Sequence, residues 1–317
     1  SYLIRIHTVT FLPFRAYNID NQLIIDTLVV AINGLTLPDG ITEIGSSAFF
    51  GCSGLTSLTL PAGITSIGDD AFYGCSGLTS ITLPAGITEI GGSAFNGCSR
   101  LTSLTLPAGI TSIGGGAFYG CSGLTSLNLP AGITEIGGGA FGFCSGLTSI
   151  NLPGITSIGS CAFWSCSGLT SINIPASVTK IEYSAFRGCS GLTSLNLPAG
   201  ITSISNCAFS GCSGLTSIYV YAEKVPGIGS YAFEECDAKK CTVYVPKGTY
   251  GDYRSSYFGY FENIVEFDAT GIDKTTTSTD VEEVSRYSVN GQRLVGPTKG
   301  LNIVKYSDGS VKKVAVQ

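Results

Sequence analysis

A block of about 23 residues recurs with few changes from Leu35 to Cys236 and limits the folds open to this chain. Its consensus is C-S-G-L-T-S-L-x-L-P-A-G-I-T-x-I-G-x-x-A-F-x-G, and its cysteines follow at steps of 23 residues, with one step of 22 and one of 24. The short step falls where Leu152-Pro153-Gly154-Ile155 lacks the alanine of most other copies. Such a short repeat cannot bury its own apolar face, so the copies must stack as the coils of a solenoid.

The copy over 55–75 shows the coil that we expect. Alternating apolar and polar residues over 55–60 predict a half-buried strand, which ends at Pro61 because proline cannot donate to a ladder. A second short extended piece covers 64–67, and the apolar spacing over 69–75 predicts a short helical or 3-10 turn. We therefore predict a mainly β solenoid whose equivalent strands stack in parallel at ~4.8 Å.

The ends of a solenoid need covering, and the flanking sequence offers two caps. Residues 1–34, with apolar stretches over 4–14 and 23–32, form the expected N-terminal cap of the array at 35–236. Residues 237–269 form the expected C-terminal cap. That cap has strands at 242–246 and 263–267, with a short aromatic-rich helix within 247–261 between them.

A separate module is expected beyond the C-terminal cap. Residues 270–283, rich in Thr, Ser and Asp, have the composition of a linker, and residues 284–317 form a small β module. The dipeptides Asn290-Gly291 and Asp308-Gly309 are typical of hairpin turns. This module is basic, whereas the array is neutral or acidic.

Charge and hydropathy exclude several partners. Charged residues make up 12% of the chain, the net charge is -5, and the array has no basic stripe, so neither nucleic acid nor an anionic membrane is an expected partner. No apolar run has the roughly 18–20 residues of a membrane span, and the stretch 23–32 is interrupted by Asp26. Since the chain has neither methionine nor a signal segment, we expect a processed or trimmed product.

The pattern L-x-x-L-x-L-P-x-x-[IV]-T-x-I-G-x-x-A-F-x-G-C, as in Leu55–Cys75, resembles the BspA-like class of leucine-rich repeats. The segments 243–248 and 261–265 are similar to the caps that close such arrays, and 290–304 resembles part of the C-terminal domains of secreted Bacteroidetes proteins. The resemblance implies an extracellular or cell-surface protein of Bacteroidetes type, involved in adhesion or in binding host proteins. It identifies no ligand.

The residues give little support for catalysis. The only histidine, His7, precedes the repeats, so a triad or a histidine-based metal site has at most one member. Gly137, Gly139 and Gly142 match the dinucleotide fingerprint in spacing, but sister copies lack one or more of these glycines and no long helix follows. We predict a protein that is not an enzyme and that has no cofactor and no metal site.

The twelve cysteines are expected to be free thiols. Equivalent cysteines in stacked coils point the same way, so their Cβ atoms lie ~4.8 Å apart, beyond the ~3.5–4.5 Å that a disulfide prefers. Cys161 and Cys207 are two coils apart and too distant to pair. Only Cys236 and Cys241 leave a disulfide open.

Function is expected at positions that packing leaves free to vary, and these form three rows. The strand-face row pairs an all-serine column with Thr59, Thr82, Thr105, Asn128, Asn151, Asn173, Asn196 and Tyr219. The acidic row alternates between larger charged residues and serine: Glu43, Ser66, Glu89, Ser112, Glu135, Ser157, Lys180 and Ser203. Both rows can serve solubility alone, and single carboxylates ~10 Å apart cannot give one calcium ion its six or more oxygens.

The outer row, the residue after each Ala-Phe pair, varies most. Its members are Phe50, Tyr73, Asn96, Tyr119, Gly142, Trp164, Arg187, Ser210 and Glu234. Side chains of Trp, Tyr and Arg are enriched at binding anchors, so Phe50, Tyr73, Tyr119, Trp164 and Arg187 are the predicted partner-binding residues. Packing between neighbouring coils is the other explanation for these rings.

Two functions remain open at this point. The first is a surface-exposed or secreted adhesion protein that binds an extracellular protein or glycan, and the second is a structural spacer without a specific ligand. The sequence does not predict the oligomeric state.

Overall fold

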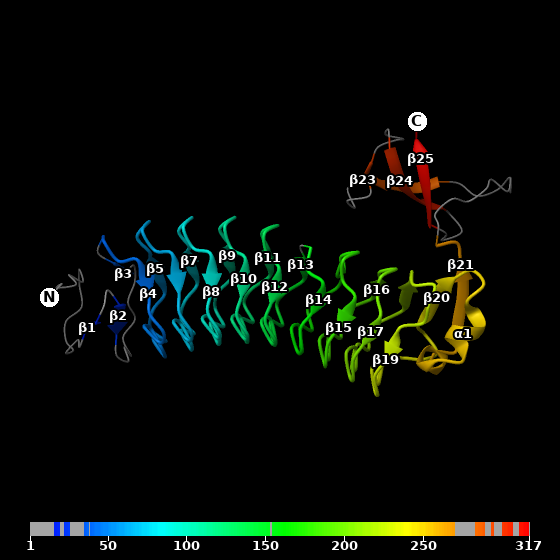
Figure 1. Cartoon of the computed structure of the whole chain (residues 1–317), viewed down its shortest axis with the longest axis horizontal. Coiled ribbons are helices and arrows are strands. Elements are labelled where there is room, and N and C mark those ends of the chain that lie inside the picture. Colours follow the sequence, from blue (N-terminus) through cyan, green and yellow to red (C-terminus); the bar gives the residue numbers. More distant parts are fainter. Residues whose placement is uncertain are drawn as a thin grey trace.

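The computed structural model describes residues 16–19, 22–25, 35–37, 39–152, 154–269, 283–288, 293–294, 300–306 and 311–316. The molecule is an elongated solenoid whose coils stack along one axis, with the N-terminal strands at one end and a small separate sheet near the other (Figure 1). It has about 10 turns spaced roughly 23 residues apart and little helix, which confirms the predicted fold class.

The first strand of each coil builds one side of the solenoid. These strands are β3 (Leu35–Thr36), β5 (Ser57–Thr59), β7 (Ser80–Thr82), β9 (Ser103–Thr105), β11 (Ser126–Asn128), β13 (Ser149–Asn151), β16 (Ser194–Leu197) and β18 (Ser217–Val220). They pair in parallel within three separate sheets, β3 to β9, β11 with β13, and β16 with β18, and within the first sheet Leu58, Ile81 and Leu104 align. The serine and the following Thr or Asn point outward around this buried residue, as the alternation predicts.

The second strand of each coil builds another side. These strands are β4 (Glu43–Ile44), β6 (Ser66–Ile67), β8 (Glu89–Ile90), β10 (Ser112–Ile113), β12 (Glu135–Ile136), β14 (Ser157–Ile158), β15 (Lys180–Ile181), β17 (Ser203–Ile204) and β19 (Gly227–Ile228). They form two sheets that divide between β12 and β14. The division follows the segment 152–155, where the coil is one residue short and its second strand cannot keep the regular register.

The third side differs from the expected helical turn. Over 46–52 the chain makes consecutive turns: Phe50 N–H donates to Ser47 O at 3.1 Å, while Phe49 N–H donates to Ala71 O of the next coil at 2.7 Å. Alternate amides thus bond within the turn and between coils. The pattern requires a positive φ at Ser47 (59°) and Gly51 (69°), which a helix does not have.

The core consists of columns of similar apolar residues that run the length of the array. Leu, Ile, Ala, Phe and Cys at the inward positions are buried in most coils, and Ile41 and Ile228 near the two ends are partly buried. The phenylalanine of each Ala-Phe pair stacks on its neighbours with ring centroids 5.0–5.5 Å apart and interplanar angles of 2–10°. Each coil therefore buries the open face of the coil before it.

The C-terminal cap has the predicted elements. Strand β20 (Thr242–Pro246) continues the first row, and the short helix α1 (Tyr250–Arg254) and the 3-10 helix η1 (Tyr257–Tyr260) lead into β21 (Asn263–Phe267), which pairs in parallel with β20. Tyr253 is fully buried, and its Oη donates to Ala222 O at 2.6 Å.

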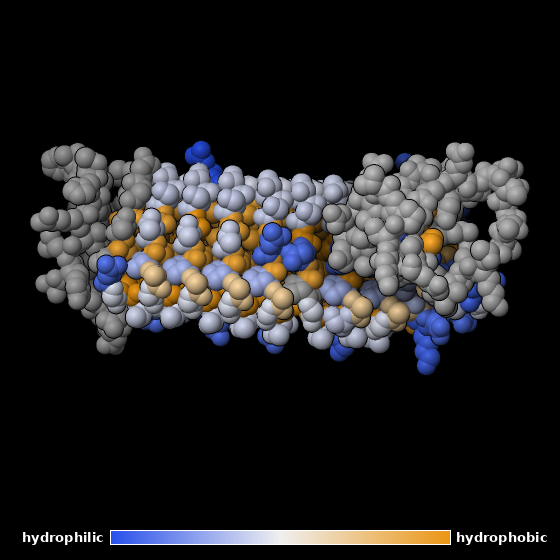
Figure 2. Space-filling model, turned by 90° about the horizontal axis from the view of Figure 1, so that it is seen from above, coloured by the Kyte–Doolittle hydropathy of each residue, from blue (hydrophilic) through white to orange (hydrophobic). Residues whose placement is uncertain are grey.

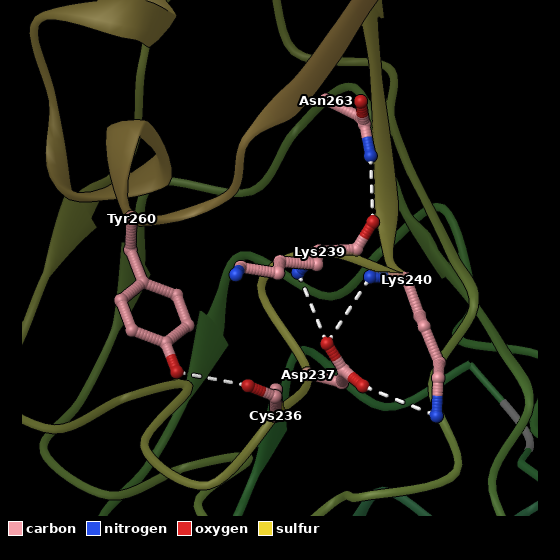
Figure 3. Close-up of polar contacts among 6 residues, drawn as sticks. All are labelled: Cys236, Asp237, Lys239, Lys240, Tyr260 and Asn263. Carbon is pink, nitrogen blue, oxygen red and sulfur yellow. Dashed lines mark hydrogen bonds and ion pairs between the residues drawn. The ribbon is translucent and has the colours of Figure 1, made fainter.

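Polar contacts fasten the loop before β20 to this cap (Figure 3). Asp237 Oδ1 accepts hydrogen bonds from the amides of Lys239 and Lys240, and its Oδ2 lies 3.3 Å from Lys240 Nζ. Tyr260 Oη donates to Cys236 O at 2.8 Å, and Asn263 Nδ2 donates to Lys239 O at 2.8 Å. Tyr260 and Asn263 belong to the cap's helical and strand segments, so these segments bond to the last coil at Cys236 and to the loop before β20 at Lys239.

Small antiparallel sheets flank the array. At the N-terminal end, β1 (Ala16–Ile19) pairs with β2 (Gln22–Ile25), which contacts β4. The C-terminal sheet has the order β23 (Arg293–Leu294), β22 (Glu283–Ser288), β24 (Gly300–Tyr306), β25 (Val311–Val316). Its Lys313 Nζ lies 5.7 Å from the ring centroid of Tyr221.

Several predicted features lie outside the described residues. These are the apolar stretch 4–14 with His7, most of the stretch 23–32, the linker 270–283 apart from Glu283, and the turns at 290–291 and 308–309. Within the described residues, no helix has the length and hydrophobicity of a membrane span.

Candidate functional site

The side chains of the outer row lie on the surface of the solenoid, next to the tightly packed Ala-Phe column. The Ala-Phe pair before each member is buried, and the next side chain therefore points out of the coil. Phe50 and Tyr73 are exposed to 48% and 37%, Arg187 is exposed, and Tyr119 and Trp164 are half-buried. Gly142 and Ser210, in contrast, are covered by their neighbours.

The predicted binding residues fall into two groups. Phe50 and Tyr73 stack face to face with centroids 4.8 Å apart and an interplanar angle of 3°. Asn96 follows and interrupts the aromatic row. The second group contains Tyr119 and Trp164 and includes a ring outside the outer row.

That ring belongs to Phe143, which the sequence reasoning missed. Its centroid lies 5.1 Å from that of Tyr119 and 4.9 Å from that of Trp164, with interplanar angles of 48° and 65°. Phe143 is 39% exposed. Tyr119, Phe143 and Trp164 thus form a continuous surface of one ring per coil over three coils, which we call the aromatic platform.

Phe143 occupies a position that most coils give to glycine. Its backbone φ is +57°, and the equivalent glycines Gly74, Gly97 and Gly120 have φ of 69–73°. An L-residue in this region costs roughly 1–2 kcal/mol relative to ordinary conformations. The break in the glycine column, Gly142-Phe143-Cys144 where sister coils read x-Gly-Cys, is the sequence signal that could have identified this residue.

Gly142 makes room for the platform. A Cβ at this position would lie 2.8 Å from Cδ2 and Cε2 of Tyr119, so any other residue would displace the ring. Gly139, in the same coil, also lies beneath Tyr119 Cδ2. These two glycines of the fingerprint-like spacing therefore support a tyrosine, and no helix follows them to form a phosphate site.

Polar groups border the platform on its C-terminal side. Tyr119 interacts electrostatically with Cys161, and Cys161 with Arg187. Burial raises the pKa of the Tyr119 phenol, and Cys161 raises it further. Burial also raises the pKa of the Cys161 thiol, while the positive charge of Arg187 acts in the opposite direction. Arg187 makes no ion pair with any other described residue.

In the strand-face row, Asn151 stabilises the structure at the short coil. Asn151 Oδ1 accepts from Leu129 N–H at 2.9 Å, and its Nδ2 donates to Leu129 O at 3.1 Å. The backbone of Asn151 also forms an isolated parallel β-bridge with Asn173 of the next coil. This asparagine pair joins the coils where the regular ladder is disturbed. Elsewhere the surface in Figure 2 is pale, with few strongly hydrophilic residues and apolar atoms visible between coils.

The acidic row borders a shallow open groove of about 1040 Å³. The groove runs across the second row of strands, and glycine pairs such as Gly91-Gly92 and Gly114-Gly115 form part of its lining beside Glu89 and Glu135. Serines alternate with these glutamates in the strand register. Among the described residues no group of three or more His, Cys, Asp or Glu side chains could hold a metal ion.

The cysteines of the repeat column are buried, hydrogen-bonded and poorly reactive because of their place inside the coil. None of the twelve cysteines forms a disulfide, Cys236 and Cys241 included. Eight buried thiols each donate to the carbonyl of the phenylalanine in the coil before, at 3.0–3.4 Å. Burial raises the pKa of Cys98 and Cys144 to about 12, so these groups stay protonated and are poor nucleophiles.

Comparison with known proteins identifies the family. The model of the BspA type leucine rich repeat region matches in six copies, over residues 29–148 and 134–264. A leucine-rich repeat protein from Bacteroides ovatus has a similar structure, with a TM-score of 0.58 and 24% identity over 83% of this chain and 77% of that one. One from Eubacterium ventriosum gives 0.46 and 20% over 68% and 91%.

A leucine-rich repeat protein from T. pallidum gives a TM-score of 0.38 and 23% identity over 71% of this chain and 86% of that one. The comparison with curated proteins found no match. The family match covers well over half of the sequence and includes both the array and much of its C-terminal cap. The chain belongs to the BspA-type leucine-rich repeat family.

Proposed function

We propose that this protein is a non-catalytic binding or adhesion protein, secreted or displayed at the cell surface, that presents its aromatic platform and Arg187 to an extracellular protein or glycan. The observation that carries the proposal is the aromatic platform. Its rings are partly exposed in an array whose other outward positions are mostly small and polar. Exposed aromatic clusters beside an arginine have the composition of binding anchors.

Glycine is the residue that the backbone conformation of Phe143 favours, and the chain uses it in the equivalent position of most coils. Ser165 and Glu235 also occupy this position, with φ of 57° and 63°, so Phe143 differs from them by its side chain and not by its backbone. Its partly exposed ring contacts the rings of Tyr119 and Trp164, which makes it the centre of the platform. The Phe50–Tyr73 pair, by contrast, has its rings stacked as coil-to-coil packing requires, and its following glycines are regular.

Membership of the family supports the same proposed function. Leucine-rich repeat proteins of this type are commonly surface-exposed and take part in protein interactions, and they are typically non-catalytic. The likeness to the Bacteroides ovatus structure supports the fold alone. We further propose the division into caps 1–34 and 237–269, array 35–236, linker 270–283 and module 284–317, the last serving export or anchoring.

A spacer function is the second candidate. It is favoured by the many Ser, Thr and Gly residues and the sparse charge of the array. Few strongly hydrophilic residues are visible along the array in Figure 2. A spacer needs length and solubility but no anchor side chains, so the two functions differ in what the platform does.

A binding panel separates them. Purified wild-type chain is presented to immobilised extracellular-matrix proteins and glycans, together with the triple variant Tyr119→Ala, Trp164→Ala, Arg187→Ala. The matched control is Phe50→Ala, Tyr73→Ala, which removes aromatic rings from the same row. We expect capture of at least one ligand by wild type and control, and none by the triple variant. Capture of nothing by folded wild type would favour the spacer, and equal capture by all three would reject the platform.

A further inference from the structure

The near-identity of the coils makes each departure from the repeat informative. Three departures gather on consecutive coils: Phe143 in place of glycine, the single tryptophan Trp164, and the short segment 152–155. The coils before them carry Asn96 in the outer row, and the coil after Arg187 carries a buried Ser210. Phe143 and Trp164 are in ring contact and, with Tyr119, form one local surface, while the short segment falls between β13 and β14 in the sequence.

The platform runs along the solenoid with one ring per coil. Its ring centroids are 5.1 Å and 4.9 Å apart and the ring planes are inclined to each other by 48° and 65°, so the rings contact one another without sharing one plane. Arg187 follows in the coil after Trp164, and the four groups cover three coil steps, about 14 Å at ~4.8 Å per coil. Such an arrangement fits a ligand that is itself a linear polymer with a repeat close to the coil spacing.

The side chains of the platform and Arg187 restrict the chemical class of the ligand. Aromatic faces stack on the apolar C–H faces of pyranose rings, and a sugar unit in a linear glycan advances by about one coil. The Tyr119 phenol can donate a hydrogen bond to a sugar hydroxyl. The Arg187 guanidinium, which has no ion-pair partner among the described residues, matches the planar, bidentate geometry of a carboxylate.

A folded protein fits this surface less well. A stable protein interface buries about 800 Å² on each partner, whereas the apolar part of the outer row ends at Asn96 on one side and at Arg187 and Ser210 on the other. Three rings and one cation are sufficient for a few sugar units but small for a protein partner.

We propose that the aromatic platform binds a linear polysaccharide containing uronic acid, with sugar rings packed on the exposed ring surfaces of Tyr119, Phe143 and Trp164 and one carboxylate paired with Arg187. This inference rests on the proposed binding function and names its ligand class. Because the chain has a net charge of -5, a polyanion gains no long-range attraction, and affinity depends on stacking plus one ion pair. Binding therefore depends weakly on salt, with a slope near that of a single contact.

The experiment measures binding of the full chain to hyaluronan oligosaccharides, which contain uronic acid, and to the same oligosaccharides after carboxyl reduction. Poly-L-glutamate serves as the acidic polypeptide. We expect wild type to bind hyaluronan at least about 10-fold more tightly than the reduced form, because a charge-assisted hydrogen bond is lost on reduction. Arg187→Gln should remove this preference and leave affinity for the reduced form unchanged. Trp164→Ala should weaken binding of both forms, and Phe50→Ala, Tyr73→Ala neither.

Each contrary outcome rejects a different part of the proposal. Equal affinity for native and reduced oligosaccharides, or binding of poly-L-glutamate as tight as that of hyaluronan, would overturn the assignment to a uronic-acid glycan. Platform-dependent capture of a matrix protein with no glycan binding would overturn it while leaving the proposed function intact. Capture of no protein and no glycan by wild type would reject both. Circular dichroism and thermal unfolding of every variant confirm that lost binding is not lost fold.

Discussion

The thiol of Cys75 donates a hydrogen bond to the backbone carbonyl of Phe49, 3.1 Å away in the preceding coil. The same carbonyl accepts the amide of Cys52 within its own coil at 3.1 Å. Each repeat thus bonds to its neighbour through the interior as well as along its three outer sides. The cysteine column therefore acts as a structural ladder and needs no disulfide.

Thiol counting tests this ladder. The native protein at pH 8 should react with iodoacetamide mainly at the two partly exposed cysteines, Cys161 and Cys207, because the other thiols are buried. Unfolding in guanidinium without reductant should release all 12 thiols, counted with Ellman's reagent. A count of six or fewer would show that neighbouring cysteines pair.

Alkaline pH should destabilise the fold. Burial raises the pKa of Cys98 and Cys144 from 9.0 to about 12, so between these values the unfolded chain has lost protons that the folded chain keeps. Their stabilisation is therefore complete below pH 9 and is lost as the pH rises toward 12, at about 1.4 kcal/mol per pH unit for each thiol. Urea unfolding at pH 8, 9, 10 and 11 measures the slope. A Cys98→Ala, Cys144→Ala variant should show a shallower one, and a flat wild-type profile would contradict the pKa shifts.

Close packing of backbones makes one glycine column far less tolerant than another. A Cβ at Gly114 would lie 2.5 Å from the amide nitrogen of Gly92, whereas at Gly109 the nearest atom is 3.6 Å away. We expect Gly114→Ala to lower the free energy of unfolding by about 2–3 kcal/mol, and Gly109→Ala to change it by less than about 1 kcal/mol. Chemical denaturation of the pair measures the difference, and equal effects would mean that the coils separate easily.

The C-terminal cap should depend on one buried hydroxyl. Tyr253→Phe leaves the carbonyl of Ala222 without its 2.6 Å partner in a dry site, at a cost of about 1–3 kcal/mol. Tyr260→Phe is the control, because Tyr260 is 44% exposed and water can replace its bond to Cys236. Urea unfolding should place the Tyr253 variant below the Tyr260 variant, and size-exclusion chromatography should show more association of the former as the last strands open. The reverse order would mean that the cap is held elsewhere.

Sequence periodicity was sufficient for the coil, for the orientation of Leu58 and its equivalents and for the cap strands, because each of these follows from one column or one local pattern. Periodicity did not predict the contacts between side chains that belong to different columns. The ring of Tyr119 lies over Gly142, and Phe143 links two residues of another row, relations that exist only after the coils stack. The third side was mistaken for a helical turn because its apolar spacing matches one, while its positive φ angles leave no trace in hydropathy.

Restoring the repeat consensus at the platform should separate binding from stability. Phe143→Gly removes a left-handed residue strained by roughly 1–2 kcal/mol and loses ring contacts with Tyr119 and Trp164 worth about 0.5–1.5 kcal/mol each. Glycine adds a backbone entropy cost of about 0.5–1 kcal/mol. At their midpoints these terms leave a net loss of about 1 kcal/mol, so the free energy of unfolding should fall by only about that amount while ligand capture falls. Phe143→Ala retains the strain and loses the ring, so it should be less stable than Phe143→Gly and equally defective in capture. Guanidinium unfolding and the binding panel measure both quantities. If Phe143→Gly were strongly destabilised, the ring would be a packing element of the coil and the platform would lose its best evidence for a role in binding.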